Sequence, residues 1–96
     1  MYEISYSKSA ERYFKKLKDK HLLRAFKDAI DKLKENPYVG SQKGGDLRGI
    51  YGYDVKHNSV SYEIAYRIYE EGNQLVVVIL AGTRENFYEE LKRLIK

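Results

Sequence analysis

Residues 60–83 have the sequence VSYEIAYRIYEEGNQLVVVILAGT, and this stretch decides the fold class. From Val60 to Tyr69 apolar and mixed residues alternate, which is typical of a half-buried strand. Residues 75–81 are apolar on both faces and therefore predict a central strand. Gly72-Asn73 between them suits the positive φ of a tight turn, so an antiparallel hairpin is expected.

The flanking residues extend this hairpin. Upstream, residues 50–55 predict another strand, with a turn at His57-Asn58, so that the last three strands form an antiparallel meander. Downstream, Gly82-Thr83 is expected to open a last helix with Thr83 as its N-cap. The apolar stripe of that helix consists of Phe87, Leu91 and Leu94.

The N-terminal part predicts a strand and two helices. Residues 2–6 alternate and indicate a first strand. Ser7 or Ser9 can cap the first helix and Asp19 the second, which ends at Asn36-Pro37. Because the helices are so close in sequence, they are expected to pack as an antiparallel hairpin.

The predicted order is β-α-α-β-β-β-α in a single domain of residues 1–96, which is an α+β fold. The helical hairpin is expected to cover one face of a small antiparallel sheet. The other face would stay open and would show Ser61, Glu63, Ala65 and Arg67. An open face with charged side chains is a candidate site.

Composition limits the possible functions. The 96 residues are 43% hydrophobic and 33% charged, which is typical of a small soluble globule. No apolar run reaches the roughly 18 residues of a membrane span, and the N-terminus has no signal-peptide core, so a cytoplasmic protein is expected. The absence of cysteine excludes disulfides, thiolate zinc sites and a cysteine nucleophile.

The net charge of +4 lies wholly in residues 1–37, where ten basic residues oppose six acidic ones. Such an excess favours nucleic acid or an acidic protein as a partner, or serves solubility alone. His21 and His57 lack the spacing of metal ligands, and no phosphate-binding loop or serine-nucleophile elbow is present. No metal and no cofactor are therefore expected.

The C-terminal half contains a set of basic and polar residues suited to chemistry on RNA. In such a reaction a base removes the 2′-OH proton, a cation stabilises the phosphate oxygens, and an acid protonates the leaving 5′-oxygen. Glutamate or histidine can be the base, and tyrosine, histidine or lysine the acid. The candidates are Lys43, Arg48, Lys56, His57, Glu63, Arg67, Arg84 and Tyr88.

Three segments resemble motifs of the RelE/ParE toxin superfamily of type II toxin–antitoxin systems. They are residues 46–49 (DLRG), 61–68 (SYEIAYRI) and 82–88 (GTRENFY), similar to the family's L-x-G, Y-R-I-x-Y and I-G-x-R-x-x-x-Y motifs. The order and spacing of these segments, and the element order, agree with the family over nearly the whole chain.

The resemblance implies a cytoplasmic toxin that inhibits translation as a ribosome-dependent, metal-independent mRNA endonuclease. Its implied partners are a cognate antitoxin protein and the ribosome with its mRNA, with DNA contacted only through the antitoxin complex and no membrane. Other members inhibit DNA gyrase, so a gyrase-directed toxin is the alternative. A weakly active member whose main role is antitoxin binding is a further one.

The resemblance also suggests roles for residues. Arg84 and Tyr88 match the family's late arginine and tyrosine, and Lys56 matches a strand lysine, whereas the strand arginine corresponds to Glu63 and a second lysine to Asp54. Glu63 is expected to act as a general base oriented by Arg67. The predicted catalytic residues are Glu63, Arg84, Tyr88 and Lys56, and the predicted RNA-binding residues are Lys43, Arg48, His57 and Arg67.

Overall fold

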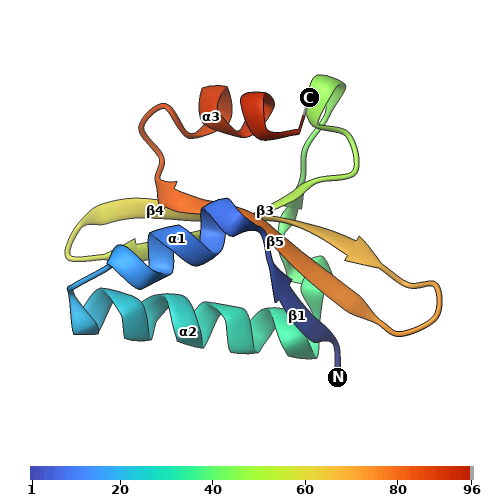
Figure 1. Cartoon of the computed structure of the whole chain (residues 1–96), viewed down its shortest axis with the longest axis horizontal. Helices are drawn as coiled ribbons and strands as arrows, with labels where there is room; N and C mark the ends of the chain where they lie inside the picture. The colour runs from blue at the N-terminus through green and yellow to red at the C-terminus, as the bar shows by residue number, and fades with distance from the viewer. Residues whose placement is uncertain (96) are drawn as a thin grey trace.

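The computed structural model describes residues 1–95, and within them the elements follow the predicted order (Figure 1). The short 3₁₀ turns η1 (Pro37–Val39) and η2 (Gly45–Leu47) flank a short extra strand in the loop before the meander. The helices and strands are β1 (Glu3–Tyr6), α1 (Lys8–Lys16), α2 (Lys20–Glu35), β2 (Ser41–Gln42), β3 (Tyr51–His57), β4 (Val60–Tyr69), β5 (Leu75–Thr83) and α3 (Phe87–Leu94).

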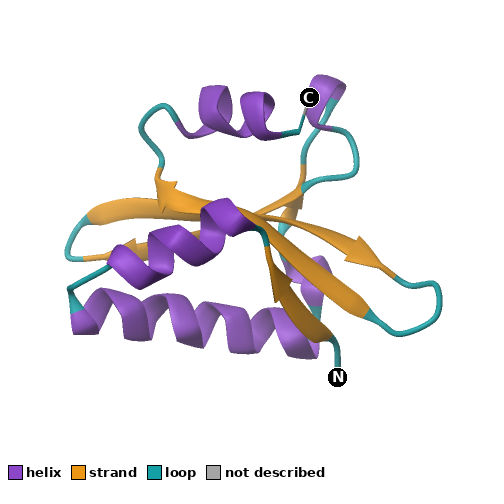
Figure 2. Cartoon of the chain, in the orientation of Figure 1, coloured by secondary structure: helices purple, strands orange, loops and turns teal. Residues whose placement is uncertain are grey.

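The strands form one sheet in the order β1-β5-β4-β3-β2 (Figure 2). Strands β3, β4 and β5 form the predicted antiparallel meander, and β5 is an interior strand, because β1 pairs with its other edge. That pairing is parallel, so the sheet is mixed rather than wholly antiparallel. The long connection that a parallel pair needs is the chain between β1 and β5, which contains the helical hairpin and strands β2 to β4.

The helices cover both faces of the sheet. Helices α1 and α2 lie together on one face, and α3 lies on the other (Figure 1). The expectation of an open second face was therefore wrong, and Glu63 and Ala65 are only 1% and 0% exposed. The reason is a second core, because Phe87 and Leu91 of α3 pack with Ala65 and with apolar residues of the sheet and of the preceding loop.

Most predicted helix boundaries agree with the structure. The Ser7 hydroxyl accepts from the Ala10 N–H at 3.0 Å, Asp19 caps α2, and Asn36 ends it. The predicted start of the last helix was wrong, because α3 begins at Phe87. Thr83 is not a cap, because β5 continues to it and pairs it with Tyr62.

Two turns determine how the strands connect. His57 is the last residue of β3, so the turn lies at Asn58 and Ser59, whose φ values are 51° and 66°. Gly72 turns the chain between β4 and β5 with φ 69°, as predicted. No helix within residues 1–95 is long and apolar enough to cross a membrane.

Candidate active site

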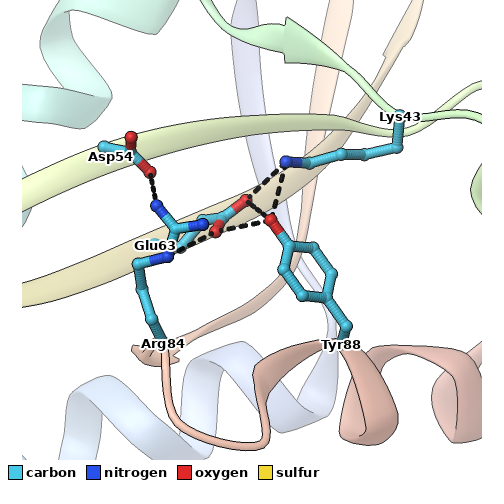
Figure 3. Close-up of polar contacts among 5 residues, drawn as sticks. All are labelled: Lys43, Asp54, Glu63, Arg84 and Tyr88. Carbon is cyan, nitrogen blue, oxygen red and sulfur yellow. Dashed lines mark hydrogen bonds and ion pairs between the residues drawn. The ribbon is translucent and has the colours of Figure 1, made fainter.

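Glu63 is the only polar or charged residue among the fully buried ones in residues 1–95. Its side chain projects from the middle of β4 toward α3, into a cluster that also contains Lys43, Tyr88 and Arg84 (Figure 3). A buried carboxylate requires compensation by charge or hydrogen bonds. Here Lys43 Nζ lies 3.1 Å from Oε2, and the Tyr88 hydroxyl donates to Oε1 at 3.0 Å.

Lys43 reaches Glu63 from the loop between β2 and η2. Its ammonium group donates to the Tyr88 hydroxyl at 2.8 Å and lies 4.9 Å from the centre of the Tyr88 ring. Burial alone would lower the pKa of Lys43, but the contacts with Tyr88 and Glu63 outweigh burial and raise it. Lys43 is therefore a protonated partner of the Glu63 carboxylate at neutral pH.

Gly52 makes room for this ion pair. It lies in β3, opposite Ala65 of β4. A methyl group at Gly52 would overlap Oε2 of Glu63 and would come within 2.7 Å of Lys43 Cε. Glycine in a strand interior often marks such a close approach. Gly52 therefore leaves free the space in which Lys43 and Glu63 meet.

Arg84 and Tyr88 come from the segment that leaves β5. The Arg84 N–H donates to the Ser61 carbonyl at 3.2 Å, and the Arg84 carbonyl accepts from the Phe87 N–H at 3.2 Å. Asn86 then takes a left-handed conformation, with φ 58°, and α3 begins. Arg84 therefore precedes the helix, whereas a helix that opens at Thr83, as predicted, would have included it.

The guanidinium group of Arg84 joins two carboxylates. Its Nη1 lies 3.1 Å from Oδ1 of Asp54, and its Nε lies 3.7 Å from Oε1 of Glu63. Arg84 and Asp54 have side chains that are 44% and 63% exposed, whereas the Glu63 side chain is 1% exposed. The cluster therefore runs from a buried carboxylate to an exposed cation.

The geometry provides the groups needed for proton transfer next to a phosphate. Glu63 can accept a proton, Tyr88 and Lys43 can donate one, and Arg84 can bind an anion from solvent. The charges of Lys43 and Arg84 balance those of Glu63 and Asp54. No group of three or more histidine or acidic side chains that could hold a metal ion is found within residues 1–95.

The structure brings together four of the eight residues predicted for the site, namely Lys43, Glu63, Arg84 and Tyr88. Lys43 was expected to bind RNA, but it lies among the candidate catalytic groups. Lys56 is exposed on β3, two residues beyond Asp54, and Arg48 is exposed after η2. Within residues 1–95, neither forms a side-chain hydrogen bond or ion pair with the cluster.

Two further predictions need correction. Arg67 does not orient Glu63, because its guanidinium lies beside Gly49, where a Cβ would be 3.0 Å from Nη1. His57 lies away from the cluster, because its ring faces the loop between α1 and α2, with Nε2 3.9 Å from Asp19 Oδ2. Strand alternation explains this placement, since His57 and Asp54 lie on opposite faces of β3.

Two contributors were not predicted as site residues. Asp54 was noted only as a departure from the family's lysine, and Gly52 was not considered. A signal for Gly52 was available, because glycine is unfavourable in the interior of a strand and needs a reason there. The signal for Asp54 was its position two residues after Gly52, which places both on the same face of β3, the strand that pairs with the strand of Glu63.

A family model described as the ParE-like toxin of type II bacterial toxin–antitoxin systems matches residues 4–92. None of the curated proteins is significantly similar to the chain. Several solved structures are similar, and three are described below.

A chain of the intact E. coli RelBE toxin–antitoxin complex superposes with a TM-score of 0.69 and 21% identity, covering 86% of this chain and 96% of that one. A chain of the RelBE2 toxin–antitoxin complex from Mycobacterium tuberculosis superposes with a TM-score of 0.66 and 24% identity, covering 86% of this chain and 98% of that one. A mutant of E. coli toxin RelE in the free state superposes with a TM-score of 0.70 and 22% identity, covering 96% of this chain and 96% of that one.

These similarities confirm the predicted fold. The family model covers nearly the whole chain and spans the three segments that resemble RelE/ParE motifs. The chain therefore belongs to the ParE-like toxins of type II bacterial toxin–antitoxin systems.

Proposed function

We propose that the protein, as one toxin domain of residues 1–96, inhibits translation in the cytoplasm as a ribosome-dependent, metal-independent mRNA endonuclease. The observation that carries this proposal is the buried Glu63 carboxylate, with a tyrosine hydroxyl at 3.0 Å and a half-exposed arginine beside it. A base, an acid and a phosphate-binding cation thus lie within one cluster.

The proposed reaction begins at the 2′-hydroxyl of the message. Glu63 accepts its proton while the 2′-oxygen attacks the adjacent phosphorus, and Arg84 stabilises the negative charge on the phosphate oxygens. The bond to the 5′-oxygen breaks, and Tyr88 donates a proton to that leaving oxygen. Lys43 lies 2.8 Å from the Tyr88 hydroxyl and can replace this proton. The products are a 2′,3′-cyclic phosphate and a free 5′-hydroxyl.

Dependence on the ribosome agrees with the geometry of the free protein. Glu63 is saturated by its own partners, so RNA must displace at least one hydrogen bond before the base can act. A ribosome-bound message, held in a fixed conformation, supplies the positioning that a free strand lacks.

We also propose a cognate antitoxin as partner. The similar RelBE structures are toxin–antitoxin complexes. This chain has a groove of about 560 Å³ between its helices and β1, with Phe14, Phe26 and Ile30 among its lining residues. An amphipathic segment of an antitoxin that folds on binding would cover this apolar surface.

Gyrase inhibition is the second candidate, and one observation favours it. The two cations of the cluster are balanced by Glu63 and Asp54, so the site has no excess positive charge for RNA. A toxin that acts by binding gyrase does not need such an excess. It would leave messages intact and block DNA supercoiling.

The deciding experiment is translation of an end-labelled mRNA in a bacterial extract, with and without ribosomes. The expected result is new 5′ ends inside the reading frame only when ribosomes are present. Glu63→Gln should lower cleavage about 100- to 10,000-fold, the usual contribution of a general base. Glu89→Gln, on the exposed side of α3, is the matched control and should cleave normally. Intact message with normal protein yield would contradict the proposal.

A further inference from the structure

Two carboxylates face each other next to the proposed phosphate-binding arginine. Asp54 of β3 and Glu63 of β4 are direct partners in the antiparallel register. Like charges at paired positions of neighbouring strands repel and destabilise the sheet. Arg84 relieves this repulsion, because its guanidinium contacts both side chains. The arrangement therefore depends on Arg84 staying between them.

The two contacts differ in strength and position. The contact with Asp54 is a hydrogen-bonded ion pair of 3.1 Å, whereas the nearest atoms of Arg84 and Glu63 are 3.7 Å apart. Asp54 is also the more exposed acid, since its side chain is 63% exposed and that of Glu63 is 1%. Asp54 thus binds Arg84 (Figure 3). Both side chains lie in the solvent-exposed part of the cluster, where a phosphate would arrive.

We infer that Asp54 is an internal competitor for Arg84, a positioning residue that occupies the guanidinium until an RNA phosphate displaces it. This inference rests on the proposed function and adds a residue to it. A carboxylate and a phosphate oxygen make the same kind of charge-assisted hydrogen bond to a guanidinium, so Asp54 and a phosphate compete for the Nη1 donors of Arg84. Asp54 would then make the site selective for phosphates that are positioned well enough to replace it.

The test measures binding and does not require cleavage. The probe is a fluorescent single-stranded RNA with 2′-O-methyl groups, which cannot undergo attack by its own 2′-oxygen. Its dissociation constant is measured by anisotropy for the wild type, Asp54→Asn, Arg84→Ala and the double variant. Asp54→Asn should bind about three- to tenfold more tightly, as expected for loss of an exposed ion pair that competes for Arg84. In the Arg84→Ala background the same change should have no effect.

A matched control separates competition from a general change in charge. Glu85 is exposed and adjacent to Arg84 in sequence, but makes no ion pair in the described part of the chain, so Glu85→Gln removes one negative charge without releasing Arg84. It should leave the affinity within twofold of the wild type. Thermal unfolding of each variant verifies that it is folded.

A second probe is used if free RNA binds too weakly for its dissociation constant to be measured. Inorganic phosphate is titrated into ¹⁵N-labelled protein, and the Nε–H signal of Arg84 is followed. Asp54→Asn should lower the half-saturating phosphate concentration by the same three- to tenfold. Unchanged binding of both probes would overturn the inference, as would equal tightening in the Arg84→Ala background. A failure of the proposed function itself is seen separately, as intact message in the translation assay.

Discussion

Gly52 lies against the Glu63 carboxylate so closely that a methyl group at Gly52 would overlap Oε2. The same methyl group would be 3.0 Å from Lys43 Nζ. The ion pair between Lys43 and Glu63 therefore occupies space that a side chain on β3 would otherwise fill. A lysine from the loop that precedes β3 thus supplies a positive charge at a position where β3 itself has no side chain.

Gly52→Ala is expected to separate this ion pair. Because both neighbours are buried or nearly so, overpacking should lower the free energy of unfolding by about 1–3 kcal/mol. It should also lower cleavage in the translation assay, since Glu63 and Lys43 shift together. Urea unfolding measures the change in the free energy of unfolding, and Gly44→Ala is the control. Gly44 has extended backbone angles and nothing within 4 Å of a Cβ, so its replacement should change stability little.

Lys43→Met should reveal the charge of Lys43 through the pH dependence of stability. The folded protein raises the pKa of Lys43 above its ordinary value of 10.5. The contribution of the Lys43 ammonium group to the free energy of unfolding is therefore complete below pH 10.5. It is lost as the pH rises through the higher pKa that Lys43 has in the folded protein. The difference in unfolding free energy between wild type and variant should stay constant from pH 8 to about 10 and then shrink. A difference that grows with pH would contradict the ion pair.

Tyr88→Phe removes one hydroxyl and leaves the ring in place. Glu63 loses a donor and Lys43 an acceptor, so stability should fall by about 1–3 kcal/mol, as for a hydrogen bond to a charged group. If Tyr88 is the proposed acid, cleavage should fall by about 100-fold or more. Cleavage at the wild-type rate in a folded Tyr88→Phe protein would assign the acid to another residue, with Lys43 the first to test.

Much of the fold could be predicted because hydrophobic periodicity decides strand and helix type locally. The alternation of residues 60–69 predicted β4 with the correct bounds, and the apolar run of residues 75–81 predicted the interior strand β5. The start of α3 could not be predicted in this way. Thr83 has the chemistry of a cap, but the ladder to Tyr62 holds it in β5, and this is a tertiary effect.

The candidate site could be predicted only in part, for a similar reason. Strand alternation placed Glu63 on the correct face, and the family resemblance pointed to Arg84 and Tyr88. That Lys43 meets Glu63 depends on the path of a loop, which no local pattern encodes. The expected link from Arg67 to Glu63 was wrong, because residues four apart in a strand lie about 13 Å apart.

The docking of α3 yields the last prediction, because Tyr88 reaches Glu63 only while this helix packs on the sheet. Leu91 is 0% exposed within the second core, three residues after Tyr88. Leu91→Ala should lower the free energy of unfolding by about 2–5 kcal/mol and loosen α3. Cleavage should then fall at least as far as in Tyr88→Phe, since Arg84 is also joined to this segment. Leu94→Ala is the control, because Leu94 is 44% exposed and its loss should be nearly neutral. Wild-type cleavage by a folded Leu91→Ala protein would show that the site does not need α3, and Tyr88 would then have no catalytic role.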